Sequence, residues 1–237
     1  MYDIIVREME SLKDDREAVH LSRFFKTAPG QYGEGDRFLG IRVPMTRSIV
    51  KKYRHDLNLS DAAALVESPW HEIRLAGFLA MIEIYRRSKN PEEVISVYLN
   101  SLYHANNWDL VDLSAPYILG DYLSRHPDKR SVLDKLVAHE NLWHQRTGIV
   151  ATLGLIRKGE LSDTLRLAEM LLPHTHDLIH KASGWILREA GKKDEGKLLE
   201  FLDSHASSMP RTMLRYAIER LSPDIRKHYL SIKRTQA

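Results

Sequence analysis

The chain of 237 residues contains no cysteine. Disulfide bonds, thiolate nucleophiles, and zinc fingers or iron–sulfur clusters held by thiolates are therefore excluded, and a reducing compartment, the cytoplasm, is expected. No stretch reaches the roughly 18 apolar residues of a membrane-spanning helix. The N-terminus lacks the basic and apolar segments of a secretory signal. The sequence thus predicts neither export nor membrane contact.

A strong excess of one charge is also missing. Lys and Arg total 35 against 32 Asp and Glu, which gives a formal net charge of +3 at pH 7. Proteins that bind the nucleic-acid backbone cluster cations on one face, and a small net charge is compatible with such a cluster when the acidic residues lie elsewhere. Bulk charge alone therefore gives weak support for nucleic acid as a partner.

Internal repetition is the most informative feature that is present. Five segments align so that one equivalent position recurs at intervals of 30 to 38 residues, a period typical of repeated helix pairs. The segments are 68–87, 106–125, 141–160, 177–193 and 207–223, and the equivalent position holds Arg74, Asp112, Arg146, Lys181 and Arg211. Small residues follow this position in the first four segments, which lets helices approach closely.

These segments are apolar around most of their girth and carry cations where they end, which favours helices over buried strands. Shorter amphipathic stretches at 91–102, 129–140, 161–172 and 196–205 predict the partner helices. We therefore expect an all-α fold, an α-solenoid of HEAT-like helix pairs with a concave face lined by the second helices. A single repeat domain over 1–237 is predicted, with a helical N-terminal region at 1–56 and repeats from about 57 to 237.

Residues 27–42 interrupt the helical pattern with four glycines and a proline. A GxGxxG phosphate loop is absent, so a connecting loop is the better interpretation. The only dense histidine group, His174, His176 and His180, surrounds a turn and a predicted helix start, which favours turn and capping roles over metal binding. We expect neither a metal nor another cofactor.

Asp112 is the single carboxylate at an equivalent position that otherwise holds cations. Spacing alone favours a salt bridge between repeats over a catalytic carboxylate that nearby cations keep ionised, and the two roles are compatible. Trp108 lies four residues earlier, so a continuous helix places both side chains on one face. Packing predicts Trp108 nearly as well, because Trp70 and Trp143 occupy similar positions in other segments.

The segments NNWDLVD, LWHQR and IHKASGWILRE resemble the AlkD-like family of DNA alkylation repair glycosylases, which are HEAT-repeat proteins. The resemblance spans nearly the whole chain. It implies an active cleft formed by Trp108, Asp112, Arg146 and Trp185. It also implies a monofunctional glycosylase that hydrolyses the N-glycosidic bond of cationic alkylpurines, of the 3-methyladenine and 7-methylguanine types, in double-stranded DNA without a base-binding pocket. No such pocket is evident in the sequence.

The number of carboxylates agrees with that chemistry. Ordinary glycoside hydrolysis uses two carboxyl groups, whereas the sequence offers one good candidate. A purine that is already positive leaves as a neutral base without a general acid, so Asp112 suffices if it stabilises the oxocarbenium-like sugar and orients water. Trp108 and Trp185 are then expected to face the lesion's sugar and backbone, and Arg146 to bind phosphate and help fix Asp112.

Further cations are expected to position the DNA backbone rather than to read bases. They are Lys181, Arg188, Arg211 and Arg215. One departure from the family lies in the stretch SRFFK, where Phe24 replaces a tyrosine that completes the aromatic cleft in some relatives; Tyr32 is the other candidate for this side of the cleft. The alternative function is a non-catalytic HEAT-repeat scaffold that binds nucleic acid or protein. We expect no obligate protein partner.

Overall fold

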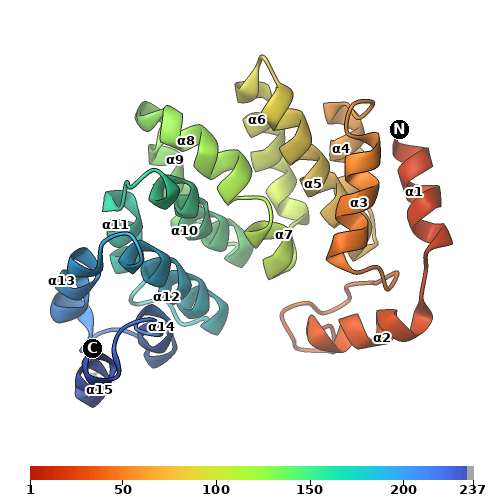
Figure 1. Cartoon of the computed structure of the whole chain (residues 1–237). Coiled ribbons are helices and arrows are strands. Elements are labelled where there is room, and N and C mark those ends of the chain that lie inside the picture. Colours follow the sequence, from red (N-terminus) through yellow and green to blue (C-terminus); the bar gives the residue numbers. More distant parts are fainter. Residues whose placement is uncertain (234–237) are drawn as a thin grey trace. The chain divides into compact units, whose positions relative to one another are not determined.

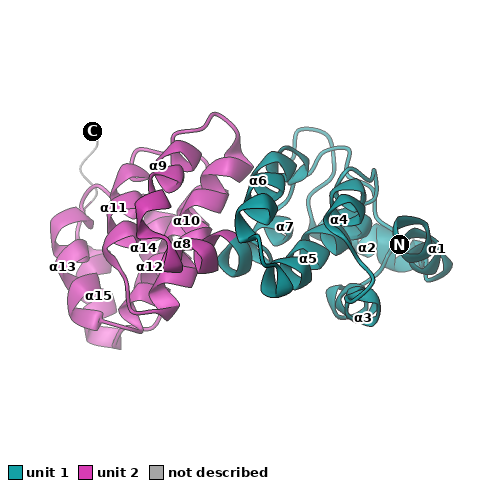
Figure 2. Ribbon diagram, turned by 90° about the horizontal axis from the view of Figure 1, so that it is seen from above, with its two compact units in different colours: residues 1–118 teal, residues 119–237 magenta. Residues whose placement is uncertain are grey.

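The structure, a computed structural model, describes residues 1–233, and the regular elements in this range are helices (Figure 1). Extended pairing within the range is limited to one bridge between Arg37 and Trp70. The chain divides into two compact units, of which unit 1 spans residues 1–118 and unit 2 begins at Leu119 (Figure 2). The predicted all-α class is confirmed, while the single repeat domain stays a prediction.

Unit 1 consists of two rows of helices. The first row is α1 (Tyr2–Ser11), α4 (Leu59–Val66) and α6 (Pro91–Ser101), and the second-helix row is α3 (Val43–Tyr53), α5 (His71–Arg87) and α7 (Trp108–Asp112). A short 3-10 helix, Leu102–His104, follows α6, and α2 (Asp15–Phe24) stands outside both rows. Within the second-helix row, α5 packs against α3 and against α7.

Unit 2 repeats the same plan. Its second-helix row is α10 (Leu142–Arg157), α12 (Asp177–Gly191) and α14 (Arg211–Ala217), with α12 packed against both neighbours. The partner helices are α9 (Ser131–Val137), α11 (Ser162–Met170) and α13 (Glu195–His205). The remaining elements are α8 (Asp121–Arg125), a 3-10 helix at Pro127–Lys129 and α15 (Pro223–Ser231). The four predicted partner helices are thus all present.

The segment 106–125 is not one helix. It is broken into α7, a π-helical turn at Pro116–Gly120 and α8. Pro116 has no backbone N–H and cannot donate the hydrogen bond that would extend the helix past the carbonyl of residue 112, four positions earlier. α7 therefore ends at Asp112, and Trp108 and Asp112 are its first and last residues.

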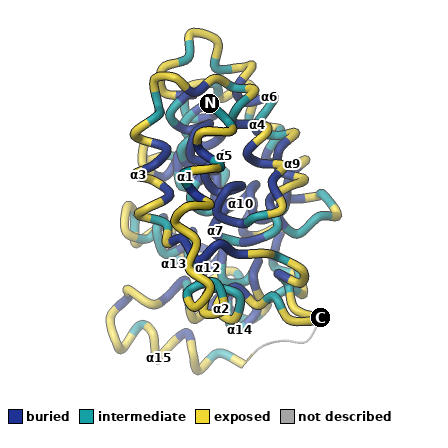
Figure 3. Tube along the Cα trace, turned by 90° about the vertical axis from the view of Figure 1, so that its right-hand side faces the viewer, coloured by how far each residue is buried: buried dark blue, intermediate teal, exposed yellow. Residues whose placement is uncertain are grey.

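The small residues of the repeats mark close helix contacts, as the sequence predicts. A Cβ atom on Gly77 would lie 2.6 Å from the Val66 side chain of α4, and one on Gly148 would lie 2.7 Å from the Val137 side chain of α9. Because these neighbours approach so closely, second helices are covered on several sides. Residues 71–82 of α5 are all buried, and α5 and α10 are largely dark blue in Figure 3.

The N-terminal region departs from the plain helix-pair pattern. The glycine-rich segment 27–42 is a loop that joins α2 to α3, as predicted. Gly40 has φ +89°, and a Cβ atom there would lie 2.1 Å from the carbonyl oxygen of Asp14, so only glycine fits. This contact brings the end of the loop against the start of α2. None of the helices in residues 1–233 is long and apolar enough to cross a membrane.

Replacing Gly184 by alanine tests the close packing. A Cβ atom at Gly184 of α12 would lie 2.4 Å from the carbonyl oxygen of Met213 in α14. We expect Gly184→Ala to lower the free energy of unfolding by about 1 to 3 kcal/mol, measured by urea titration. Gly196→Ala is the matched control, because its nearest atom lies at 3.3 Å and alanine is the better helix former. A stability loss in both variants, or in neither, would contradict close packing.

Candidate functional site

The start of α7 is fixed by a buried asparagine. The Asn107 side chain accepts a hydrogen bond from the Trp108 N–H at 2.9 Å and donates to the Phe25 carbonyl at 3.4 Å. It thereby caps the helix and ties it to the chain that follows α2. Trp108 and Asp112, one turn apart on α7, are both half-buried.

A buried charged network lies beside Trp108. The His71 ring, at the start of α5, contacts Asp36 through Nδ1 at 2.8 Å and Asp109 through Nε2 at 2.9 Å. Burial lowers the pKa of His71, but the two carboxylates, Asp109 foremost, outweigh it and raise the pKa to about 9. His71 is therefore an imidazolium at neutral pH that donates from both nitrogens. The Phe38 and Phe25 ring centroids lie 4.5 and 4.9 Å from its own.

Arg74 extends this network toward α7. Its guanidinium donates to Asp36, to the Asn106 side chain at 2.9 Å and to the Ser68 carbonyl at 2.8 Å. Burial would raise the pKa of Asp36, but His71 and Arg74 together hold it below its usual value. The first equivalent position of the repeats thus links α5 to the residues that lead into α7.

Glu72 anchors the glycine-rich loop from the same end of α5. Its carboxylate accepts hydrogen bonds from the backbone N–H groups of Leu39, Gly40 and Ile41 at 2.8 to 3.1 Å. The roles of Glu72, His71, Asp36 and Asp109 were not predicted from the sequence. The one available signal was a polar His–Glu pair at the start of a segment that is otherwise apolar around most of its girth.

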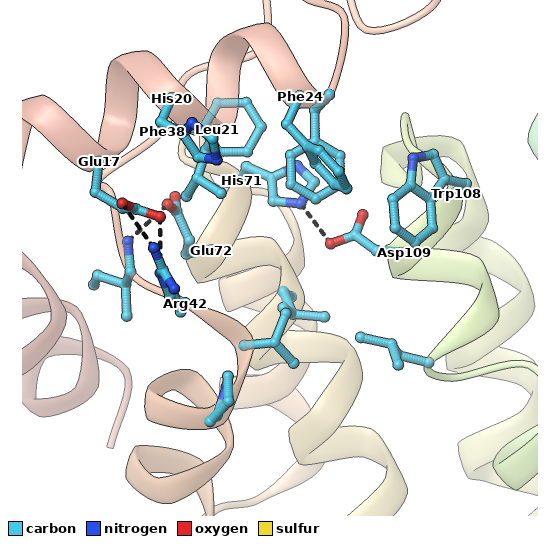
Figure 4. A pocket seen from close by; sticks show the side chains of 16 residues that line it. Glu17, His20, Leu21, Phe24, Phe38, Arg42, His71, Glu72, Trp108 and Asp109 are labelled. Atoms are coloured by element: carbon cyan, nitrogen blue, oxygen red, sulfur yellow. Dashed lines mark hydrogen bonds and ion pairs between the residues drawn. The ribbon is translucent and has the colours of Figure 1, made fainter.

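An aromatic hollow of about 460 Å³ opens between α2 and the N-terminal ends of α3, α5 and α7 (Figure 4). Phe24, 54% exposed, lies with its ring centroid 6.0 Å from that of Trp108, edge to face, and Phe25 lies 5.4 Å from Trp108. At the α2 side, Arg42 donates to Glu17 at 2.9 Å. The hollow is lined by Glu17, His20, Leu21, Phe24, Phe25, Phe38, Ile41, Arg42, Val43, Pro44, His71, Glu72, Leu75, Trp108, Asp109 and Leu113.

This hollow was not visible in the sequence, because its aromatic residues come from three separate segments. The structure brings Phe24 to Trp108, but Tyr32 is not among the described residues that line the hollow. Asp112 lies outside the lining as well. Burial, and to a smaller extent the negative charge of Asp112, raises the pKa of Tyr98, whose hydroxyl lies 3.0 Å from Ser114 Oγ.

Arg146 and Trp185 lie in unit 2, on the adjacent helices α10 and α12. The Arg146 side chain is buried and donates to the Leu178 carbonyl, in the first turn of α12, at 2.6 Å. It therefore ties one second helix to the next, as Arg74 does in unit 1. Trp185 is half-buried, one turn beyond Lys181, whose ammonium pairs with Asp177 at 2.8 Å. The assembly of Trp108, Asp112, Arg146 and Trp185 into one cleft stays a prediction.

The other candidate backbone contacts also lie in unit 2. Arg188 pairs with Glu219, and Arg211 donates to the carbonyls of Leu230 at 2.7 Å and Ile232 at 3.0 Å. Arg215 is exposed. Contacts between these cations and DNA remain predictions.

The histidine group of unit 2 serves the local backbone. His176 Nδ1 accepts from the Leu178 N–H at 3.1 Å and so caps α12, and His174 Nε2 lies 2.9 Å from the Gln145 side-chain oxygen. His180 Nε2 lies 2.5 Å from the His174 carbonyl oxygen. The capping and turn roles agree with the sequence-based expectation. Residues 1–233 contain no group of three His, Cys, Asp or Glu side chains arranged to hold a metal ion.

Comparison with known proteins connects this geometry to a family. A family model described as DNA alkylation repair enzyme matches residues 5–221. A solved structure described as a predicted DNA alkylation repair enzyme from Enterococcus faecalis aligns with a TM-score of 0.74 and 19% identity, covering 89% of this chain and 97% of that chain. At this identity the likeness concerns the fold, and it agrees with the predicted α-solenoid. No curated protein matches the chain significantly.

The raised pKa of His71 predicts a loss of stability at alkaline pH. A folded pKa of about 9 against an ordinary value of 6.5 means that the imidazolium's contribution is fully present below pH 6.5 and is lost as the pH rises through 9. We expect the wild type to lose roughly 3 kcal/mol of unfolding free energy over this window. His71→Gln should be less stable at pH 6.5 and lack this dependence. Parallel curves for the two proteins would refute the assignment.

The lowered pKa of His144 in unit 2 predicts a loss of stability at acid pH. Burial and the neighbouring His139, whose ring stacks at 4.1 Å, lower the pKa of His144 from 6.5 to about 4. Stability from the neutral form is present above pH 6.5 and is lost as the pH falls toward 4. Because carboxylates also titrate there, the quantity to measure is the difference from His144→Phe. Between pH 6.5 and 4, the difference in unfolding free energy between the two proteins should change by about 2 to 3 kcal/mol. A difference that stays constant would show that His144 does not cause the acid dependence.

Proposed function

The chain belongs to the DNA alkylation repair enzyme family, and from this premise we propose that it is a monofunctional DNA glycosylase. Its substrate is double-stranded DNA that carries cationic alkylated purines of the 3-methyladenine or 7-methylguanine type. Its reaction is hydrolysis of the N-glycosidic bond. The observation that carries the proposal is the placement of the Asp112 carboxylate on α7, a single turn from Trp108.

The chemistry explains why one carboxylate is enough. A cationic purine departs as a neutral base, so the leaving group needs no proton from an acid. Asp112 stabilises the positive charge that develops on the deoxyribose and orients the attacking water. At an effective dielectric of about 20, opposite charges about 4 Å apart interact by roughly 4 kcal/mol, or about a thousandfold in rate if the interaction is confined to the transition state.

The aromatic side chains supply the second part of the proposal. Trp108 and Trp185 present π-faces to the sugar and backbone of the lesion, a contact that strengthens as the sugar becomes positive. Phe24 stands beside Trp108 with more than half of its surface exposed, which supports its place in the aromatic cleft. Since Phe24 has no hydroxyl, it contributes contact area and no hydrogen bond. Tyr32, which is outside the lining of the aromatic hollow, is the weaker candidate.

The cations hold the duplex rather than read it. We assign phosphate contacts to Lys181, Arg188, Arg211 and Arg215, and we place Arg146 beside Asp112 and a phosphate. The side chain of Arg146 already donates to the Leu178 carbonyl, so its position is set by the packing of α10 on α12. We further propose action in the cytoplasm, without a cofactor or an obligate protein partner.

Replacing Asp112 by asparagine tests the reaction directly. Asparagine keeps the size of the side chain but removes its charge, so single-turnover release of 7-methylguanine from duplex DNA should fall by about a thousandfold. Affinity for unmodified duplex should stay within a few fold, because Asp112 is not a phosphate contact.

The matched control is Asp134→Asn on the partner helix α9, where the carboxylate pairs with Arg166. This variant should release 7-methylguanine at the wild-type rate. Full activity of Asp112→Asn would remove the carboxylate from the mechanism. A wild-type protein that binds duplex DNA in a salt-dependent manner but releases no alkylated base would instead favour the non-catalytic scaffold.

A further inference from the structure

A second hollow in unit 1 has a different character from the aromatic one. It measures about 460 Å³ and is lined by Arg47, Val50, Lys51, Arg54, Leu79, Ile82, Glu83, Arg86 and Tyr117. The lining residues from α3 and its C-terminal cap, and those from α5, follow the same spacing of three, four and seven residues. That spacing selects one face of each helix. The basic groove, as we call this hollow, therefore runs between the facing sides of two packed helices.

The groove carries four cations and a single acid. Arg86 pairs with Glu83 at 2.8 Å, and Arg54 donates to the Lys51 carbonyl at 3.3 Å. Arg47 and Lys51 are exposed, and within residues 1–233 neither has a carboxylate at salt-bridge distance. Four like charges around one hollow repel one another, and a bound anion would relieve this repulsion.

The helix macrodipole does not account for all of these cations. Arg54 caps the C-terminus of α3 and Arg86 lies in the last turn of α5, where a positive charge is stabilised. Arg47, in contrast, lies in the N-terminal half of α3, where the macrodipole gives a cation no benefit. A binding role explains its position beside Lys51.

The shape of the groove is fixed by packing. Arg87 of α5 donates to the carbonyls of Arg54 and Leu57, which holds the end of α3 against α5. The floor is apolar, since Val50, Leu79 and Ile82 are at most 4% exposed. A rigid groove with an apolar floor strengthens the interaction between its cations and an anion, because less water screens the charges.

The dimensions favour an extended anion over a compact one. The lining of α3 from Arg47 to Arg54 extends about 10 Å at 1.5 Å per residue. Measured along the duplex axis, this length corresponds to about three phosphates of one strand, at 3.4 Å of axis per phosphate. The aromatic hollow lies along the same helices: Leu75 lines it, and Glu83 of the basic groove follows on α5 about 12 Å further on. The α5 residues that line the basic groove lie between about 6 Å (Leu79) and about 17 Å (Arg86) beyond Leu75, a range that includes the width of the DNA major groove, about 12 Å.

We propose that the basic groove between α3 and α5 binds the phosphodiester backbone of duplex DNA, at a phosphate site separate from the aromatic hollow. This inference rests on the proposed function for the identity of the polymer. It adds a phosphate site in unit 1 to the cations of unit 2, and it requires no contact with a base. Its contribution is to affinity and to register along the duplex, since phosphate contacts position a protein without reading sequence.

The test uses the double variant Arg47→Gln/Lys51→Gln and a labelled, unmodified duplex. The dissociation constant is measured between about 50 and 200 mM NaCl. We expect binding about tenfold weaker at low salt, and a plot of log affinity against log salt that is less steep by about 1.8 for two lost phosphate contacts. The charge-preserving variant Arg47→Lys/Lys51→Arg should bind like the wild type, which separates charge from damage to the fold.

The control Lys135→Gln/Lys197→Gln removes two exposed charges from the partner helices α9 and α13 and should leave affinity and slope unchanged. An unchanged slope in Arg47→Gln/Lys51→Gln, or an equal change in the control, overturns the proposal. If the groove binds only free phosphate, phosphate buffer should raise the wild-type Tm, while wild type and Arg47→Gln/Lys51→Gln should show the same salt slope on DNA. This result also overturns the proposal.

The salt dependence of DNA binding tests the basic groove independently of the chemistry at Asp112. A wild-type protein without excision activity would refute the glycosylase proposal, while the salt slopes on unmodified duplex would still decide for or against the basic groove.

Discussion

The end of unit 1 that holds the aromatic hollow depends on one buried cation, the His71 imidazolium, between Asp36 and Asp109. These three residues come from the glycine-rich loop, α5 and α7, so a single ring joins three segments, and the hydrogen bonds of Glu72 and Arg74 reinforce this junction. Removing one partner of such a buried pair typically costs about 3 to 5 kcal/mol, because the remaining charge is left without compensation. Trp108 is the residue next to Asp109 on α7, so the network anchors the helix that carries it.

The repeats use their equivalent position for a related purpose. Arg74 reaches Asn106 ahead of α7, Arg146 reaches the Leu178 carbonyl in α12, and Arg211 reaches the carbonyls of Leu230 and Ile232. In each case a cation on one second helix donates to polar atoms of a helix that follows it in the chain, or of the residues that flank that helix. Asp112 cannot donate in this way, because a carboxylate has acceptors only. The repeat that holds Asp112 therefore has an acceptor at the position where the other repeats have a donor.

The chain combines two kinds of surface along α3 and α5. The N-terminal ends of these helices border the aromatic hollow, where exposed Phe24 meets Trp108, and the C-terminal ends border the basic groove. An aromatic surface contacts sugars and bases, whereas cations contact phosphates, so the two ends suit different parts of one polymer. The separation of these properties along a single pair of helices explains how a modest net charge is compatible with a strongly basic local site.

The sequence by itself determined the helical repeats. Apolar periodicity, small residues and the recurrence of one position are local or regularly spaced signals, and they predicted the rows of helices, the close contact at Gly148, the loop at 27–42 and the capping role of His176. The sequence also predicted that Trp108 and Asp112 share one helix face, because residues four apart lie about one helical turn from each other. The break after α7 was missed, although Pro116 was visible as a residue unable to extend the helix.

Only the tertiary structure decided which distant segments meet. Asp36, His71 and Asp109 have no common spacing, and the energy of a buried ion pair depends on burial and distance, neither of which a sequence pattern encodes. The same holds for the aromatic hollow, where Phe24 and Trp108 meet, and for the basic groove, where Arg47 and Arg86 face one hollow. Periodicity specifies which face of each helix is buried or polar, but packing decides which face it meets, because many pairings of similar amphipathic helices satisfy the same local pattern.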